Sequence, residues 1–126
     1  MEIIIYNTSE TPIYEQIAGQ IKGLILSGEL KSGEALPSLR LLAKNLRVSV
    51  ITTKRAYEEL EQEGYIRSVP GKGCFVSAKS SQLLEEEKLR VVEEKLAQAV
   101  ETARKTGVSL EEMQEILETL YEEEQT

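Results

Sequence analysis

Histidine is absent from this 126-residue sequence, and cysteine occurs once, at Cys74. A lone cysteine cannot form an intramolecular disulfide, and without histidine neither a Cys/His zinc site nor a Ser-His-Asp triad can be assembled. The carboxylates fall mostly on predicted solvent-facing helix surfaces and form no recognisable acid/base pair. These absences predict a protein that is not an enzyme and that requires no metal or cofactor.

Long apolar runs are missing as well. No segment approaches the roughly 20 apolar residues that a membrane-spanning helix needs. The first ten residues, MEIIIYNTSE, also lack the basic region that opens a signal peptide. We therefore expect a soluble cytoplasmic protein.

Acidic residues outnumber basic ones, but only in the second part of the chain. The net charge is −7, yet residues 1–78 carry nine Lys/Arg and nine Glu, whereas residues 79–126 carry six Lys/Arg and thirteen Glu. A neutral segment with its basic side chains on one face can bind DNA, so the total charge does not exclude a nucleic-acid partner. The shift in composition predicts two domains, residues 1–78 and residues 79–126.

Two helical patterns joined by a short turn lie within residues 36–76. Ser38 can cap the first helix, whose apolar side comprises Leu39, Leu42, Ala43 and Leu46. The chain turns at Arg47 and Val48, and Ser49 can cap a second helix that Gly64 is placed to end. The buried side of the second helix comprises Ala56, Tyr57 and Leu60. This spacing is typical of a helix-turn-helix unit, whose second helix enters the major groove of DNA.

An additional helix precedes this unit. Thr11 and Pro12 predict an N-cap followed by proline at the first helical position, and Gly28 predicts the end of the helix. The apolar stripe of this helix comprises Ile13, Ile17, Ile21, Leu24 and Ile25. Residues 2–6, EIIIY, indicate either a short strand or an arm packed on the body of the domain.

A β-hairpin wing is predicted after the second helix of the unit. Residues 65–69 and 74–76 are strand-like, and the residues between them, PGKG at 70–73, have turn chemistry. Lys72 lies between two glycines at the tip, where the backbone can approach a phosphate or a minor groove closely. Cys74 is most simply a half-buried strand residue.

From about Ser80 onwards the composition shifts to Glu, Lys, Leu and Ala. Gly107 separates two amphipathic helical patterns, and a capping box between Ser109 and Glu112 predicts the start of the second one. These stripes can form the core of a hairpin alone, but their width favours a second copy of the chain as cover. We therefore expect a homodimer with an interface formed by Leu89, Val92, Leu96, Ala99, Val100, Ala103, Met113, Leu117 and Leu120.

Seven groups of residues occur in an order that resembles the GntR family of bacterial transcription regulators. They are PIYEQI at 12–17, GEL at 28–30, LPSLRLLA at 36–43, VS at 48–49, AYEEL at 56–60, EGYI at 63–66 and GKGCFV at 71–76. The resemblance covers roughly residues 10–77 and implies a winged helix-turn-helix DNA-binding domain. Two short helices after this domain are similar to the YtrA subfamily, and that similarity implies that they mediate dimerisation.

The same resemblance implies a homodimeric regulator of a near-palindromic operator, usually a repressor and often of a transporter operon; it names no effector. Carried over position by position, the family's DNA contacts fall on Arg40, Ser49, Thr52, Lys54, Gly71 and Lys72. Val50 departs from the family pattern, because many members have arginine there. Valine cannot form a bidentate contact with guanine, but it can meet a thymine methyl group, so we include Val50 in the DNA-binding set.

Alternatives remain for both the residues and the function. Arg40 can form a surface ion pair instead, and a small error in helix phase would exchange Arg55 with Lys54 or Thr52. The domain can also serve as a protein-interaction adaptor that does not read DNA, because a fold does not fix a function. The sequence favours a mostly α fold with a small β wing, in which a winged helix-turn-helix domain is followed by an α-helical hairpin.

Overall fold

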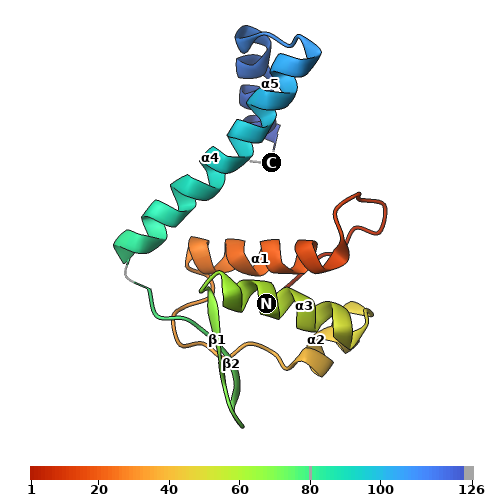
Figure 1. Ribbon diagram of the computed structural model, residues 1–126, viewed down its shortest axis with the longest axis vertical. Coiled ribbons are helices and arrows are strands. Elements are labelled where there is room, and N and C mark those ends of the chain that lie inside the picture. The colour runs from red at the N-terminus through yellow and green to blue at the C-terminus, as the bar shows by residue number, and fades with distance from the viewer. Residues whose placement is uncertain (80, 124–126) are drawn as a thin grey trace. The chain divides into compact units, whose positions relative to one another are not determined.

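The computed structural model describes residues 1–79 and 81–123, and these residues form five α-helices and one two-stranded antiparallel sheet (Figure 1). The elements are α1 (Ile13–Ser27), α2 (Leu39–Leu46), α3 (Val50–Gln62), β1 (Ile66–Val69), β2 (Gly73–Val76), α4 (Ser81–Thr106) and α5 (Leu110–Glu123). This order confirms the predicted mostly α fold with a small β wing.

The chain divides into two compact units, Met1–Glu85 and a second unit that begins at Glu86. Helix α4 contributes to both units, since it starts at Ser81. The expected start near Ser80 lies outside the described residues, and the domain division at residues 78 and 79 stays a prediction.

The core of the first unit lies between α1 and α3, which pack against each other (Figure 1). The buried residues of α1 are Ile17, Ala18, Ile21, Ile25 and Leu26, and those of α3 are Thr53, Ala56, Tyr57 and Leu60. Tyr65, Ile66 and Val76 close the core from the wing. Each large apolar side chain that is fully buried here contributes about 1.5–3 kcal/mol. This core therefore fixes α3 by one side and leaves its other side to solvent.

The start of α1 differs from the sequence prediction by one residue. Pro12 is the cap residue, in an extended conformation, and the helix begins at Ile13 rather than at the proline. Thr11 lies one residue before the cap, where its N–H donates to the Ser9 hydroxyl and its carbonyl accepts from the Gln16 side chain. The predicted end is confirmed, since Gly28 adopts a left-handed conformation directly after Ser27.

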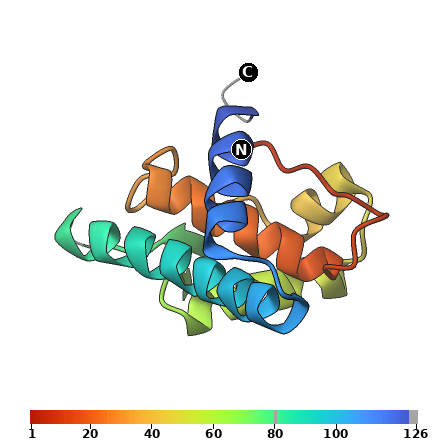
Figure 2. The ribbon, with the colours of Figure 1, turned by 90° about the horizontal axis from the view of Figure 1, so that it is seen from above.

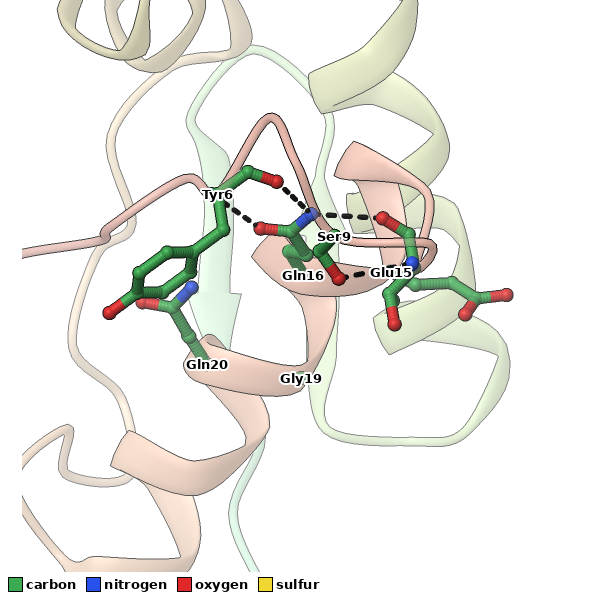
Figure 3. Close-up of a pocket in the computed structure, with 7 residues that line it drawn as sticks. Tyr6, Ser9, Glu15, Gln16, Gly19 and Gln20 are labelled. Atoms are coloured by element: carbon green, nitrogen blue, oxygen red, sulfur yellow. Dashed lines mark hydrogen bonds between the residues drawn. The ribbon is translucent and has the colours of Figure 1, made fainter.

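Residues 2–6 form an extended arm rather than a strand, and Figures 1 and 2 show this red segment without sheet partners. Two side-chain amides of α1 replace a neighbouring strand. The Gln20 amide pairs with the Ile4 N–H at 2.9 Å and the Ile4 carbonyl at 2.7 Å. The Gln16 amide pairs in the same way with the N–H and carbonyl of Tyr6, at 2.8 and 3.0 Å (Figure 3). Of the two alternatives for this segment, the arm is confirmed.

The two helices of the helix-turn-helix unit begin at the predicted caps. The Ser38 hydroxyl accepts from the Leu41 N–H at 3.1 Å, and the Ser49 hydroxyl accepts from the Thr52 N–H at 3.2 Å. The turn between the helices is at Arg47, as predicted. Thr53 then ties α3 to α2, because its buried hydroxyl lies 3.0 Å from the Leu39 carbonyl.

Tyr57 fixes the other end of this arrangement. Its hydroxyl donates to the Pro37 carbonyl at 2.7 Å, just before α2 begins. Burial raises the pKa of the Tyr57 phenol, so the hydroxyl stays protonated and able to donate. Hydrogen bonds from Thr53 and Tyr57 therefore set the orientation of the two helices.

The wing is a hairpin in which Ile66 pairs with Val76 and Val69 pairs with Gly73. The predicted strands differ from the observed ones by single residues at their ends, a difference within the normal uncertainty of strand limits. The Lys72 N–H donates to the Val69 carbonyl at 2.9 Å and closes the turn. Gly71 has a positive φ of 76°, which a glycine adopts without strain.

The second unit contains the helical hairpin predicted from the sequence. Gly107, with a φ of 80°, separates α4 from α5. The capping box is confirmed, since the Ser109 N–H donates to the Glu112 carboxylate and the Glu112 N–H donates to the Ser109 hydroxyl, both at 3.1 Å. The bond from the Ser109 N–H is the main cause of a lowered pKa of the Glu112 carboxyl. No helix among the described residues is both long and apolar enough to cross a membrane.

Candidate nucleic-acid interface

Helix α3 has opposite charges at its two ends. Its second turn carries Lys54 and Arg55, and acidic residues follow at Glu58, Glu59, Glu61 and Glu63. The Lys54 ammonium lies 3.9 Å from the Glu58 carboxylate, but both side chains are about two-thirds exposed, so this pair contributes little. A polyanion is therefore attracted to the first two turns of α3 and repelled from the rest of the helix.

The first turn of α3 contains three of the predicted contact residues: Ser49, Val50 and Thr52. The two hydroxyls lie 2.9 Å apart and share a hydrogen bond, while the Ser49 oxygen also caps the helix. Val50 is 41% exposed. The structure thus brings these residues together at the end of α3 that the charge distribution favours, and their contacts with DNA stay a prediction.

The question of helix phase is answered by Arg55. Its guanidinium lies 3.8 Å from the centre of the Tyr14 ring and donates to the Tyr14 hydroxyl at 3.0 Å. These contacts hold Arg55 against α1, whereas Lys54 has only the weak pair with Glu58. Lys54 is therefore the better candidate for a DNA contact.

Arg40 and Lys72 supply positive charge from two other elements. Arg40 is exposed in the first turn of α2, and Lys72 is exposed between β1 and β2. Within residues 1–79 and 81–123 neither side chain makes a hydrogen bond or an ion pair, so the alternative of a surface ion pair at Arg40 finds no partner there. In Figure 1, α2 and the tip of the wing lie on the side of α3 away from α1. We call Arg40, Ser49, Val50, Thr52, Lys54 and Lys72 the reading surface.

Ile51 is an exposed residue of α3 that the sequence analysis did not include among the candidate DNA contacts. It is 80% exposed, the largest value among the exposed large apolar residues of the described chain. At about 100° per residue, Ile51 projects almost opposite the buried side of α3. The position of Ile51 relative to the apolar stripe of this helix was the signal that could have identified it.

Arg47 is the only non-glycine residue with a positive φ, 57°, in the described part of the chain. A side chain in this conformation costs about 1–2 kcal/mol. Arg47 also lines a cleft of about 470 Å³ together with Ser49, Thr52 and residues of the N-terminal arm. The conformation follows from the position of Arg47 as the C-cap of α2, and attraction of a phosphate by its side chain stays a prediction.

Replacing Arg47 with glycine is expected to raise stability and to weaken DNA binding together. Glycine removes a conformational cost of about 1–2 kcal/mol, which exceeds the roughly 0.4–1 kcal/mol lost to its greater freedom in the unfolded chain, so we expect Tm to rise by about 2–5 °C in calorimetry. Loss of one cation per protomer should lower affinity in a fluorescence-anisotropy titration by about tenfold. Arg47→Asn is the control for the conformational cost, because asparagine tolerates a positive φ. A lower Tm for both variants would contradict the assigned cost.

A second candidate surface is an apolar groove of about 530 Å³ between α4 and α5. Seven of the nine predicted dimer residues line it, namely Leu96, Ala99, Val100, Ala103, Met113, Leu117 and Leu120. Only Ala103 is buried, and Leu96, Leu117 and Leu120 are 43–52% exposed. Leu89 and Val92 lie outside the groove and are 72% and 55% exposed. One copy of the hairpin therefore does not bury its own stripe, which disfavours the hairpin as a self-contained core.

Comparison with known proteins gives three findings. A family model described as "Bacterial regulatory proteins, gntR family" matches residues 13–76. The HTH-type transcriptional repressor YtrA of Bacillus subtilis (strain 168) is 42% identical over 107 residues, which cover 85% of this chain and 82% of that protein. The crystal structure of a transcriptional antiterminator from Listeria monocytogenes EGD-e has a TM-score of 0.77 and 32% identity, with 96% of this chain and 90% of that chain covered.

A structure with DNA is also similar. The AraR DNA-binding domain in complex with operator ORX1 has a TM-score of 0.55 and 26% identity, with 61% of this chain and 96% of that chain covered. An operator-bound DNA-binding domain therefore has a fold similar to the winged helix-turn-helix described above.

Proposed function

Because the chain belongs to the gntR family of bacterial regulatory proteins and is a DNA-binding transcriptional regulator, we propose that it acts as a homodimeric repressor of a near-palindromic operator. The observation that carries the dimer is the exposed apolar groove of the α4–α5 hairpin. Repression is supported by the likeness to YtrA of Bacillus subtilis, a named repressor that matches most of the chain. As in other bacterial regulators of chromosomal genes, we place its action in the cytoplasm.

The reading surface defines how each protomer meets DNA. The first two turns of α3 enter the major groove, where Ser49, Val50, Thr52 and Lys54 lie closest to the base edges. Arg40 and Lys72 contact phosphates that flank this groove, and the positive φ at Gly71 lets the tip of the wing approach the DNA backbone. Two-fold symmetry of the dimer then requires two half-sites, about 34 Å apart or a multiple of that distance.

Occupation of a promoter is the mechanism of repression that this geometry supports. A small-molecule effector, if one binds, acts by changing the relative placement of the two reading surfaces. We propose a transporter operon as the target, from the resemblance to the YtrA subfamily. Inverted repeats upstream of the neighbouring genes supply candidate operators for the experiments below.

Replacing Arg40 or Lys72 with alanine tests the assignment of the phosphate contacts. Each variant should lower operator affinity by about 10- to 100-fold, because the dimer loses two contacts and each exposed contact contributes about 0.7–1.4 kcal/mol. Loss of a phosphate contact in each protomer should also reduce the slope of log affinity against log salt by about 2. Fluorescence anisotropy at several salt concentrations measures both quantities.

Lys95→Ala is the matched control, because Lys95 is exposed on α4 outside the reading surface. Its affinity and salt slope should equal those of the wild type. If Arg40→Ala and Lys72→Ala also behave like the wild type, the contact assignment is wrong. A wild-type protein whose DNA binding does not weaken with salt would instead contradict DNA reading itself.

A further inference from the structure

The first turn of α3 offers DNA an apolar edge. Ile51 is 80% exposed and Val50 is 41% exposed, whereas the residues on the inner side of the same helix are at most 4% exposed. Single exposed apolar residues are common on protein surfaces. These two are adjacent, and they lie in the turn of α3 that enters the major groove in the proposed function. Their side chains can therefore contact base edges.

The polar groups of this turn are partly engaged with each other. The Ser49 and Thr52 hydroxyls hydrogen bond to each other at 2.9 Å, and the Ser49 oxygen also accepts from the Thr52 N–H. A hydrogen bond from either hydroxyl to a base edge has to compete with the cap of the helix. One of the two hydroxyl protons remains free to donate, and the methyl groups of Val50 and Ile51 are exposed beside this pair.

The two cations of α3 lie outside its first turn. Lys54 projects from the next turn and is a flexible cation suited to a phosphate or to a guanine, and Arg55 is held on the Tyr14 ring. The major groove presents one apolar group, the C5 methyl of thymine. An apolar edge of α3 therefore has one complementary feature on the operator.

We propose that Val50 and Ile51 read thymine methyl groups, so that each half-site has A·T pairs where the first turn of α3 lies. This inference rests on the proposed function, because it assumes that α3 lies in the major groove. Ile51 is then a specificity-determining residue, and thymine carries most of the preference at this point of the operator. Binding buries one or two thymine methyl groups per half-site against these aliphatic side chains and displaces water from both surfaces.

Deoxyuridine in place of thymine tests the proposal, because it removes the methyl group and leaves every hydrogen-bonding group unchanged. Duplexes are first selected from a random library with the full-length protein, and each thymine of a selected duplex is then replaced in both half-sites. At one or two symmetric positions we expect affinity to fall by about tenfold, since each buried methyl group contributes about threefold to fourfold. Other thymines should be insensitive.

The variants Val50→Ala and Ile51→Ala assign the effect to this edge. In the double variant the thymine and deoxyuridine duplexes should bind equally, as a double-mutant cycle requires of two groups in contact. Leu41→Ala is the matched control, because Leu41 is also apolar and 50% exposed but lies on α2. It should retain the full sensitivity to deoxyuridine.

Four outcomes overturn the proposal. Equal affinity for all deoxyuridine duplexes would show that methyl groups are not read, although DNA binding itself would stand. Sensitivity that persists in the double variant would assign the methyl contact to another residue. A large fall in Tm or a change of oligomeric state in Ile51→Ala would show that protein covers this side chain. If no duplex is enriched from the library, the proposed function fails as well.

Discussion

Introducing aspartate at Leu96 and Leu117 together is expected to convert the protein to a monomer. Both leucines line the apolar groove of the hairpin, and they are 43% and 50% exposed in a single chain. A symmetric dimer would bury four new carboxylates in an apolar interface, and each unpaired charge there costs several kcal/mol. Light scattering coupled to size exclusion at micromolar concentration measures the change of mass.

Operator affinity should fall with the dimer. When two reading surfaces are linked, binding of the second is intramolecular, and this effect contributes about 100- to 10,000-fold to affinity. The monomer should therefore bind a full operator about as weakly as it binds one half-site. The first unit has its own core, with Ile17, Ile21 and Leu60 at 0–1% exposure, so it should remain folded. Circular dichroism checks that point.

Gln98→Asp with Thr119→Asp is the matched control. These residues lie on the same two helices and are exposed, but neither lines the groove. The control adds the same charge and should remain dimeric with unchanged operator affinity. If the leucine variant also remains dimeric, the interface lies elsewhere. If both variants dissociate, general repulsion in an acidic unit is the cause, and the groove is not the interface.

The local features of this fold were predictable from the sequence, because they depend on residues that are neighbours in the chain. The caps at Ser38 and Ser49, and the capping box at Ser109 and Glu112, each join residues three positions apart. The sequence pattern was less reliable at the start of α1, where it predicted Thr11 as the cap and Pro12 as the first helical residue. There the Gln16 amide takes the Thr11 carbonyl, and the helix begins one residue later.

Contacts between distant residues could not be predicted from spacing. The two glutamines that hold the arm have no sequence signature, because a side-chain amide can pair with any extended backbone. Arg55 contacts Tyr14 over 41 positions of sequence, and that contact decides which cation of α3 is available to DNA. The exposure of Ile51, by contrast, could have been predicted from its position opposite the apolar stripe of α3. The sequence thus predicted the reading surface as a set of positions, and the packing of α1 on α3 now ranks them.

Reversing the charge of Lys54 should give the second large effect. In Lys54→Glu each protomer would place a carboxylate in the second turn of α3, facing the phosphates that lysine attracts. Like charges brought together at an interface cost several kcal/mol, so two reversed charges per dimer should lower operator affinity by at least about 100-fold in 0.1 M salt. The loss should shrink as salt rises, because screening weakens attraction and repulsion alike. Fluorescence anisotropy across a salt series measures it.

The fold should be almost unaffected by this substitution. The Lys54–Glu58 pair spans one helical turn at 3.9 Å on an exposed surface, so replacing it with two glutamates costs only about 0.4–1 kcal/mol. Lys105→Glu is a close match, because Lys105 pairs with Glu101 across one turn of α4 and is similarly exposed. Both variants change the net charge of the chain from −7 to −9.

The comparison of these two variants separates a contact from a long-range field. If Lys54 lies at the DNA backbone or at a base edge, Lys54→Glu should lose affinity and Lys105→Glu should bind within about twofold of the wild type. Equal losses would show that total charge governs binding and that α3 has no special role. If Lys54→Glu binds the operator as tightly as the wild type, Lys54 does not belong to the reading surface. Arg55, despite its contacts with Tyr14, would then be the cation of α3 that meets DNA.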